Sequence, residues 1–437
     1  MKVGIYTLGC KVNAYESEYV VDLLKENGYE ILPFTEVCDI YIINTCSVTN
    51  TSDAKSRKMI HQAMRRNPDA CIVAMGCFIE ANKKAEMEGV DILIGNRDKS
   101  KIVSLIEEYF QTKKQIKNLY DDLGTEFEDM EIHSFGNKTR AFVKIQDGCE
   151  NFCTYCIIPF VRGKCRSKKP ELVLREITSL VKHGYQEIVL TGIHTGNYGV
   201  DLGTDFASLL KEILEIPNLY RLRISSIEET ELNDHVLELL KNPIIANHLH
   251  IPLQSGSCEI MKAMNRKYTK EEYLKKVETI RKIRPDISIS TDVIVGFPGE
   301  TEEMFQESYQ FCQEIGFSKI HVFPYSKRNG TAAAHFPNQV DETIKKERVK
   351  KLTDLSNTLE KNYMEKFLGR KMEVLIERSD SSYSIGHTSN FLLVKVPGTF
   401  EQEEKVLVSL SEIQYPYCLG TVSCESEKKQ ETLVTNG

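Results

Sequence analysis

The chain has 437 residues, of which 41% are hydrophobic and 27% charged, and a formal net charge of −7. This length allows two or three domains, and the negative charge argues against a protein that binds nucleic acid over its whole surface. No segment approaches the roughly 18 apolar residues of a membrane-spanning helix, and the N-terminus lacks signal-peptide features. We therefore expect a cytoplasmic protein without membrane contact, whose 13 cysteines stay reduced and available to metals.

Residues 1–112 alternate between apolar strands and amphipathic helices, which predicts an α/β domain with a small doubly wound parallel sheet. The expected strands are residues 2–9, 39–45, 71–76 and 91–95, and the expected helices are 14–27 and 55–66. Cys10, Cys46 and Cys77 each directly follow one of these strands. Open α/β sheets bind ligands at the carboxyl ends of their strands. We therefore expect the three thiols to meet at one metal centre, the alternative being that they are small buried residues.

The rest of the chain divides into three parts. Residues 113–138 lose the periodicity and gain charge, which indicates a linker. Residues 139–368 contain six further strand–helix units, which predict a partial or closed parallel β/α barrel; the expected strands are 141–148, 187–192, 221–226, 248–254, 287–296 and 319–326. Residues 369–433 show period-two alternation, typical of a small β-barrel. Residues 434–437 form the expected tail, and the stretch from residue 423 has a disordered composition.

A second group of cysteines follows the first expected barrel strand. Cys149, Cys153 and Cys156 lie in the run DGCENFCTYCIIP, and thiolate sulfur suits iron–sulfur clusters and zinc. A closed zinc site or an ordinary cubane takes four protein ligands, but no fourth Cys or His occurs in the next eight residues. Three thiolates would leave one metal corner open for a substrate. Unrelated or zinc-binding cysteines are the alternative.

These segments together resemble the methylthiotransferase family of radical S-adenosylmethionine enzymes over nearly the whole chain. The resemblance is carried by TLGCKVN at Cys10, INTCSVT at Cys46, AMGC at Cys77, the DGCENFCTYC run and the terminal β segment. It implies a catalytic auxiliary [4Fe-4S] cluster on Cys10, Cys46 and Cys77. It also implies a radical [4Fe-4S] cluster on Cys149, Cys153 and Cys156, and a C-terminal TRAM domain that recognises a macromolecular substrate.

The chemistry implied by this resemblance uses two S-adenosylmethionine molecules per turnover. One methylates a sulfur held by the auxiliary cluster. The other is cleaved with an electron from the radical cluster, and the resulting 5′-deoxyadenosyl radical removes the hydrogen from C2 of an adenosine. An electron donor such as flavodoxin or ferredoxin is implied, together with a sulfur donor whose identity the sequence does not reveal. Such chemistry belongs to the cofactors, while the protein orients them and shields the reaction.

Further residues match the superfamily elements that bind S-adenosylmethionine. Tyr155 precedes the third loop cysteine, Thr191 and Gly192 match the segment that meets the methionine amino group, and Ser225, Ser226 and Glu228 lie where the ribose is expected. Val295, Phe323 and Pro324 match the segments that flank the adenine, while Gln254 and Arg266 are expected to face the methionine carboxylate or the substrate. For each of these residues, ordinary loop polarity at a strand end is the alternative.

The expected substrate follows from the wording around Cys10. TLGCKVN resembles the branch that acts on N6-threonylcarbamoyladenosine at position 37 of tRNA, beside the anticodon. The branches acting on isopentenyladenosine in tRNA and on an aspartate of a ribosomal protein remain alternatives. A non-catalytic, metal-stabilised RNA-binding protein is an alternative from another class, which an iron and sulfide analysis would distinguish.

Two basic segments suggest contact with RNA. One follows Cys156 and the other follows Cys46. Clustered cations usually bind phosphate, although they can also form a solvated face. The residues expected to contact the tRNA anticodon arm are Arg57, Lys58, Arg162, Lys164, Arg166 and Lys168. Residues 371–433 instead carry more Asp and Glu than Lys and Arg. This charge balance leaves two alternatives for the C-terminal segment: strong binding of phosphates, or positioning of the anticodon arm through a few contacts.

Overall fold

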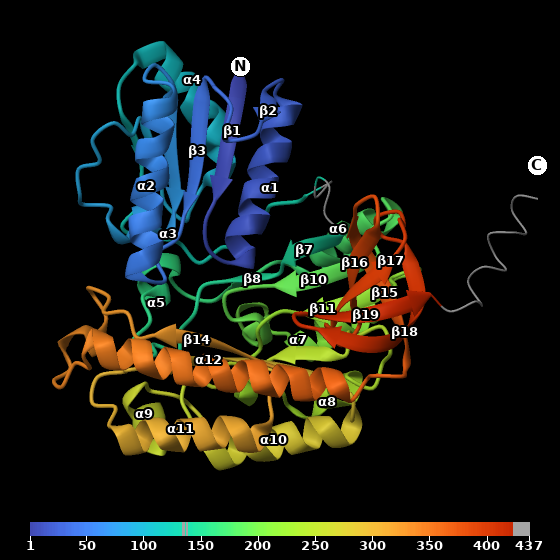
Figure 1. Ribbon diagram of the computed structural model, residues 1–437. Coiled ribbons are helices and arrows are strands. Elements are labelled where there is room, and N and C mark those ends of the chain that lie inside the picture. Colours follow the sequence, from blue (N-terminus) through green and yellow to red (C-terminus); the bar gives the residue numbers. More distant parts are fainter. Residues whose placement is uncertain (133–135, 137–138, 423–437) are drawn as a thin grey trace, which may run out of the picture.

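The computed structural model describes residues 1–132, 136 and 139–422. It shows an N-terminal α/β domain above a curved β/α domain, with a small β-barrel at one side (Figure 1). None of the helices in these residue ranges has the length and apolarity needed to cross a membrane. The expected tail at 434–437 and the end of the 369–433 segment lie outside the described residues.

The N-terminal domain is built on a parallel sheet with the strand order β2-β1-β3-β4-β5-β6. Its strands are β1 (Lys2–Thr7), β2 (Glu30–Leu32), β3 (Ile40–Thr45), β4 (Cys71–Gly76), β5 (Ile92–Ile94) and β6 (Ile116–Asn118), and its helices are α1 (Lys11–Glu26), α2 (Asn50–Arg66), α3 (Cys77–Ala81) and α4 (Ile102–Thr112). The central strands β3 and β4 are buried along their whole length, as central parallel strands usually are. The prediction of a small parallel sheet is confirmed.

Helices cover both faces of this sheet. One apolar cluster joins α1 and α4 to the sheet, and another joins α2 to the opposite face. α2 begins earlier than the sequence predicts because Thr49 caps it, accepting a hydrogen bond from Ser52 N at 3.1 Å. β2 and β6 were not expected from the sequence, and β6 lies within the segment 113–138 expected to be a linker. The sheet therefore continues past residue 112.

The second domain is an open arc of six parallel strands. The strands are β7 (Arg140–Lys144), β10 (Glu187–Thr191), β11 (Arg221–Ile224), β12 (His248–His250), β13 (Ser288–Val295) and β14 (Lys319–Pro324). They form two three-stranded sheets, and isolated parallel bridges between β11 and the β12 segment join the two. The described strands show no pairing between β7 and β14. The sequence left a closed or a partial barrel open, and the structure has the partial form.

Helices cover the outside of the arc, and α10, α11 and α12 form the lower layer (Figure 1). They are α6 (Pro170–Lys182), α7 (Phe206–Leu214), α8 (Asp234–Leu239), α9 (Cys258–Ala263), α10 (Lys270–Ile283), α11 (Glu302–Ile315) and α12 (Glu342–Glu365), whereas the short helix α5 (Ile158–Arg162) lies beside α3 at the interface with the N-terminal domain (Figure 1). A two-stranded antiparallel ribbon, β8 (Gln146–Asp147) and β9 (Arg166–Ser167), flanks the segment between them. The cysteine-rich loop lies in that segment.

The C-terminal segment forms a closed five-stranded barrel with the order β15-β16-β17-β19-β18. Its strands are β15 (Lys371–Ser379), β16 (Tyr383–Thr388), β17 (Leu393–Pro397), β18 (Lys405–Gln414) and β19 (Tyr417–Val422). The predicted small β-barrel is confirmed, and β19 is a strand that the sequence pattern did not show. The long helix α12 leads into this barrel and packs along β14, where Ile320 N donates to Ser356 Oγ at 2.9 Å.

Candidate active site between the N-terminal sheet and the open barrel

The first three cysteines lie side by side at one edge of the N-terminal sheet. Cys10, Cys46 and Cys77 follow β1, β3 and β4, which are neighbours in the sheet. Gly9 has φ +100°, and a Cβ atom there would lie 2.9 Å from Cys46 Sγ, so the close approach needs glycine. Cys46 and Cys77 are buried while Cys10 is exposed. The group is therefore open on one side.

Asn13 holds this strand edge together. Its Nδ2 donates to Leu8 O at 2.7 Å and to Thr45 O at 2.9 Å, so one amide ties the ends of β1 and β3. Asn13 is the last residue of the TLGCKVN wording, and sequence reasoning did not assign it a role. Its position three residues after Cys10 on α1 explains why the helix start and the cysteine keep a fixed geometry.

The second three cysteines lie on the loop between β8 and α5, residues 148–157, which we call the radical loop. Cys149 N donates to Gly163 O at 3.1 Å, and Cys156 N donates to Cys153 O at 2.9 Å. Thr154 anchors the loop from outside, because its Oγ1 donates to Ala263 O at 2.8 Å. All three thiols are partly exposed. The loop thus presents its cysteines at the carboxyl end of the barrel strands, where catalytic groups of such folds lie.

Both groups of cysteines have the donor chemistry of an iron–sulfur cluster. Within the described residues, no three Cys, His, Asp or Glu side chains are already arranged around a single ion. Each cysteine of a cluster binds a different iron, so its sulfurs need not meet at one point. Burial raises the pKa of the Cys156 thiol to about 12, and Cys153 and Cys149 also raise it. A bound cluster must therefore displace protons, as thiolate ligation requires.

The two groups of cysteines are neighbours in space. Cys77 packs against Ile157, the last residue of the radical loop, and against Val161 of the helix α5 that follows it. Asn96 reinforces this contact, because its Nδ2 donates to Val161 O at 2.7 Å and lies 3.4 Å from Cys77 Sγ. The N-terminal sheet edge and the loop cysteines therefore border the same domain interface.

A buried ionic network fixes the two domains on one side of this interface. Arg162 Nη1 donates to Glu16 Oε1 at 2.9 Å and to Asp147 Oδ1 at 3.0 Å, while Nη2 donates to Asn13 Oδ1 at 2.8 Å. Lys144 Nζ lies 2.9 Å from Glu16 Oε1 and 2.7 Å from Asp147 Oδ2. Despite burial, Arg162 and Lys144 hold the pKa of Glu16 well below its ordinary value. Both carboxylates therefore stay charged and paired.

This network corrects part of the expected RNA surface. Arg162, Arg166 and Lys168 are buried, and their polar atoms bind other parts of the protein. Lys168 Nζ lies 2.8 Å from Glu176 Oε2, and Arg166 Nη1 donates to Leu123 O at 3.0 Å. The prediction that these three residues contact RNA is wrong for this structure. Lys164 is exposed.

Most basic residues of α2, in contrast, are exposed to solvent. Arg57 and Lys58 are exposed, and Lys58 lies with Arg65 and Arg66 around a shallow surface depression. The helix starts four residues after Cys46, and Arg57 Cζ lies 5.7 Å from the ring centroid of Phe78, the residue after Cys77. These residues stay available to a polyanionic partner.

A second set of contacts holds the domains together on the other side. Arg328, which follows β14, donates from Nη2 to Ser47 Oγ at 2.6 Å and from Nη1 to Asn50 Oδ1 at 2.7 Å, and lies 2.8 Å from Asp53 Oδ2. Sequence reasoning did not identify Arg328. These bonds place the segment after Cys46 over the open end of the barrel.

A cavity of about 200 Å³ lies beneath that segment, and we call it the cluster cavity. Its wall combines Val48 and Thr49 with residues of the barrel. Four of the residues expected to bind S-adenosylmethionine line it: Tyr155, Gln254, Phe323 and Pro324. Cys156 lines it as well, so the cavity adjoins the radical loop. The structure thus brings these predicted residues together.

The other predicted cofactor residues have mixed positions. Arg266 bonds Glu228 and also lies 3.5 Å from Cys153 Sγ, which places this pair beside the radical loop. Ser226 is exposed at the strand end, whereas Thr191 and Ser225 are buried. Gly192 packs against Gln146, where a Cβ atom would lie 3.1 Å from Oε1. Val295 packs in the buried core of the barrel domain, and its side chain does not line the cluster cavity.

His194 is a further residue at the radical loop. Its Nδ1 lies 3.8 Å from Cys149 Sγ, and its Nε2 pairs with Glu231. Although burial opposes it, interactions with Cys149, Cys165 and Glu231 raise the pKa of His194 to about 12. His194 lies in the TGIHTG segment expected to meet the cofactor. Its position in this motif is the sequence signal that could have identified it as a residue of the site.

Comparisons with known proteins agree with this geometry. A family described as "Radical SAM superfamily" matches residues 143–312, and one described as "Uncharacterized protein family UPF0004" matches residues 2–95. The structure of the radical S-adenosylmethionine methyltransferase TsrM from Kitasatospora setae is similar with a TM-score of 0.55 and 12% identity, covering 74% of this chain and 72% of that one. This similarity concerns the fold alone.

Curated relatives match nearly the whole chain. "Threonylcarbamoyladenosine tRNA methylthiotransferase MtaB" of Bacillus subtilis (strain 168) is 44% identical over 427 residues, which are 95% of each chain. "tRNA-2-methylthio-N(6)-dimethylallyladenosine synthase" of Thermoanaerobacter sp. (strain X514) is 36% identical over 384 residues, 85% of this chain and 81% of that protein. The chain therefore belongs to the methylthiotransferase family of radical S-adenosylmethionine enzymes, which implies a [4Fe-4S] cluster and S-adenosylmethionine as cofactors.

Proposed function

We propose that this enzyme inserts a methylthio group at C2 of N6-threonylcarbamoyladenosine at position 37 of tRNA, giving the 2-methylthio derivative. The observation that carries the proposal is the contact of Cys77 with Ile157 and Val161, which puts both cysteine groups at one interface. Several relatives that match over most of the chain carry the threonylcarbamoyladenosine name. A reaction that joins sulfur to a substrate radical needs both centres at one place.

The residues divide the work between the two sides of this interface. Cys149, Cys153 and Cys156 would hold the radical cluster, and Cys10, Cys46 and Cys77 would hold a second, auxiliary [4Fe-4S] cluster. When bound, these clusters and two S-adenosylmethionine molecules supply the electron, the radical and the transferred methylthio group. Arg328 holds the segment after Cys46, whose Val48 and Thr49 form one wall of the cluster cavity, and this cover would limit the access of water and other hydrogen donors to the reaction.

The exposed cations of α2 support a phosphate-rich substrate. Arg57 and Lys58 lie on the surface of the helix that follows Cys46, where they suit the anticodon arm of tRNA. Among the residues expected to contact RNA after Cys156, Lys164 is exposed. A reduced flavodoxin or ferredoxin would supply electrons to the site.

The test is nucleoside mass spectrometry of tRNA from a strain that lacks this protein. We expect 2-methylthio-N6-threonylcarbamoyladenosine to disappear and its parent nucleoside to accumulate in tRNAs that read codons starting with A. Expression of the intact chain should restore the modification, and the Cys149→Ala variant serves as the matched inactive control. Persistence of the modification would refute the proposed substrate.

The second candidate substrate is isopentenyladenosine in tRNA, which the 36% identical Thermoanaerobacter relative favours by its name. The same analysis separates the two candidates, since loss of the 2-methylthio form of isopentenyladenosine alone would support the second. Loss of a methylthio group from a ribosomal protein, with the tRNA unchanged, would support the third branch of the family.

A further inference from the structure

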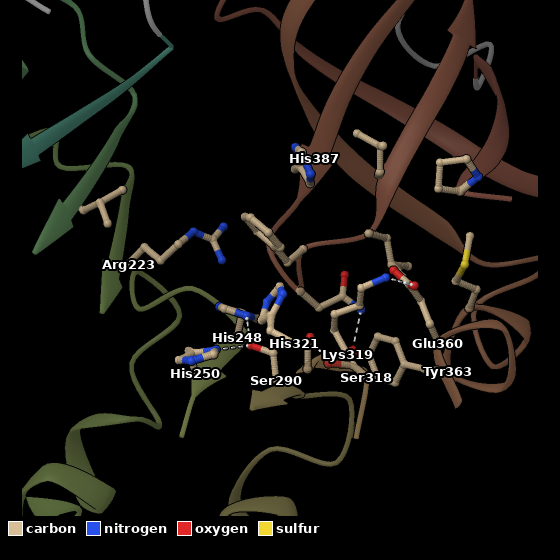
Figure 2. Close-up of a pocket in the computed structure, with 18 of the residues that line it drawn as sticks. Arg223, His248, His250, Ser290, Ser318, Lys319, His321, Glu360, Tyr363 and His387 are labelled. Atoms are coloured by element: carbon tan, nitrogen blue, oxygen red, sulfur yellow. Dashed lines mark hydrogen bonds and ion pairs between the residues drawn. The ribbon is translucent and has the colours of Figure 1, made fainter. Parts of the chain in front are cut away.

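A second and larger cavity lies inside the barrel arc (Figure 2). It has a volume of about 410 Å³, and we call it the lower cavity. It is lined by Ser288 and Ser290 at the start of β13 and by Lys319 and His321 at the start of β14, whereas the cluster cavity is lined further along the same strands. The lower cavity therefore occupies the amino-terminal end of the barrel interior. The site described above does not use it.

The two cavities share a wall. Side chains alternate along a strand and each residue adds about 3.3 Å, so Ser290 in the lower cavity and Asp292 in the cluster cavity are roughly 7 Å apart on one face of β13. His250 links them directly, because its Nε2 lies 3.2 Å from Asp292 Oδ2 and its Nδ1 lies 2.9 Å from Ser290 Oγ. A group extending from the cluster cavity toward the barrel interior would meet the lower cavity next.

The lining of the lower cavity is cationic. Four basic side chains border it: Lys11, Arg140, Arg223 and Lys319. Among the described residues of its lining, Glu360 is the single carboxylate, and it is paired with Lys319. Arg223 is held from behind by Glu187, whose Oε1 lies 2.6 Å from Nε. The wall thus holds the Arg223 guanidinium in a fixed position beside the cavity. The cavity lining as a whole has more positive than negative side chains.

Two buried nitrogen atoms in this wall are not satisfied. Arg223 Nη1 and His248 Nδ1 have no hydrogen-bond partner in the described part of the chain, and these two residues are only 2% and 8% exposed. His248 Nε2 is engaged, at 3.0 Å from Ser290 Oγ. Buried polar atoms normally have partners, so a polar group that reached either nitrogen atom would stabilise it.

Phe391 of the C-terminal barrel lies against the same two side chains. Its ring centroid is 4.6 Å from Arg223 Cζ and 4.8 Å from the His248 ring, with which it stacks. Phe391 belongs to the turn between β16 and β17 and lines the lower cavity itself. The five-stranded C-terminal barrel thus closes the interior of the β/α domain at the amino-terminal ends of its strands.

We propose that the lower cavity binds the carboxylate-bearing end of the N6 substituent of the substrate adenosine, with Arg223 and His248 as its specificity-determining residues. This inference rests on the proposed function. A threonylcarbamoyl group has a carboxylate and a hydroxyl at its end, which suit a cationic wall with free nitrogen atoms. An isopentenyl group would leave these buried groups unpaired, and a site built for polar contacts rejects a substituent that lacks them.

The test compares two RNA ligands on the wild-type holoenzyme. Anticodon stem-loops are prepared with N6-threonylcarbamoyladenosine either as the free acid or as its methyl ester, which removes the charge with little change in shape. Dissociation constants are measured anaerobically by fluorescence anisotropy. Because hydrogen bonds to charged groups are the stronger ones, we expect the acid to bind roughly tenfold more tightly. Equal binding of acid and ester would overturn the inference, even if the proposed substrate is correct.

Variants then locate the contact. Arg223→Gln should reduce the preference for the acid to about twofold or less, with little change in binding of the ester. Arg284→Gln is the matched control, because Arg284 Nη1 donates to the carbonyls of Leu240 and Ile245 and does not line the cavity; this variant should keep the wild-type preference. A folded Arg223→Gln protein with an unchanged preference would overturn the assignment. Should that variant not fold, the acid and ester comparison on the wild type still decides.

The outcome is separate from that of the proposed function. Failure of the wild type to modify the threonylcarbamoyladenosine stem-loop would refute the proposed substrate. Tighter binding of an isopentenyladenosine stem-loop than of the acid would overturn the cavity assignment as well, because it would show an apolar subsite.

Discussion

Arg162 donates a hydrogen bond of 2.9 Å to Glu16 across the interface between the N-terminal sheet domain and the barrel, and neither side chain is exposed. Glu16 lies on α1, which begins directly after Cys10, and Arg162 ends α5, which begins two residues after Cys156. The pair therefore connects the helix that follows Cys10 to the helix that follows the loop cysteines. Lys99 and Lys144 also lie within 3.0 Å of the Glu16 carboxylate, so this one side chain carries much of the ionic network.

Replacement of Glu16 should destabilise the protein strongly. Glu16→Gln leaves Arg162, Lys144 and Lys99 buried with one carboxylate fewer, and breaking a buried ion pair costs about 3–5 kcal/mol. The free energy of unfolding from denaturant titration measures this loss. Glu26→Gln on the exposed end of the same helix is the control and should change the value by less than about 0.5 kcal/mol. A similarly small effect at Glu16 would contradict the structural role of the network.

Acid should remove stability through Glu187. Although burial opposes it, Arg223, Arg140 and Arg221 lower the pKa of this carboxyl to about 2 from its ordinary value of 4.5. A lowered folded-state pKa stabilises the fold above the unfolded value, and the contribution is lost as the pH falls through the folded value. The melting temperature should therefore decline between about pH 4.5 and 2. Glu187→Gln should have a shallower decline over this range, and an identical slope would show that Glu187 is not paired as described.

Charge reversal on α2 should weaken RNA binding without unfolding the protein. Arg57→Glu and Lys58→Glu change exposed cations on the helix that follows Cys46. Each lost phosphate contact lowers the salt dependence of the binding constant by about one unit of slope. Binding of tRNA at several salt concentrations measures this, with Lys25→Glu at the exposed end of α1 as the control. An unchanged slope in both variants would exclude α2 from the RNA interface.

Arg162→Glu should instead disrupt folding, since Arg162 is buried.

The positions of the cysteines at neighbouring strand ends were predictable because their signal is local. Cys10, Cys46 and Cys77 each follow a strongly apolar strand, and parallel strands bring their ends together wherever they lie in the chain. The short strands β2, β6 and β19 escaped notice, because three to six residues with polar members carry little periodicity. The domain types were predictable, whereas the extent of each sheet was not.

The basic segment at 162–168 was misread for a different reason. A run of Arg and Lys looks the same in a sequence whether it faces water or a buried carboxylate. One partner of Arg162, Glu16, lies 146 positions away, and Glu176, a partner of Lys168, lies eight positions away, so only the folded chain reveals these pairings. Arg328 and the lower cavity were hidden in the same way, since their neighbours come from several domains.

Iron analysis should distinguish the two cysteine groups. Anaerobically reconstituted protein should contain about eight irons per chain if each group binds a [4Fe-4S] cluster. Replacement of Cys149, Cys153 and Cys156 with Ala should leave about half of this iron, because the other three cysteines lie on the N-terminal sheet. Cys312→Ala in the barrel core is the control for a buried thiol outside both groups and should keep all the iron. Zinc in place of iron would refute the radical chemistry.

The roles of the two groups should separate in activity assays. A variant with Cys10, Cys46 and Cys77 replaced by Ala keeps the radical loop, whose backbone contacts with Gly163 and Ala263 are made within the barrel domain. It should still cleave S-adenosylmethionine to 5′-deoxyadenosine under reducing conditions. It should form no methylthio product, because the site expected to hold the transferred sulfur is gone. Liquid chromatography of the small-molecule and nucleoside products measures both reactions in one sample. Normal methylthiolation by this variant would show that the sulfur reaches the substrate without the N-terminal cysteines, and loss of both products would show that the two sites cannot act separately.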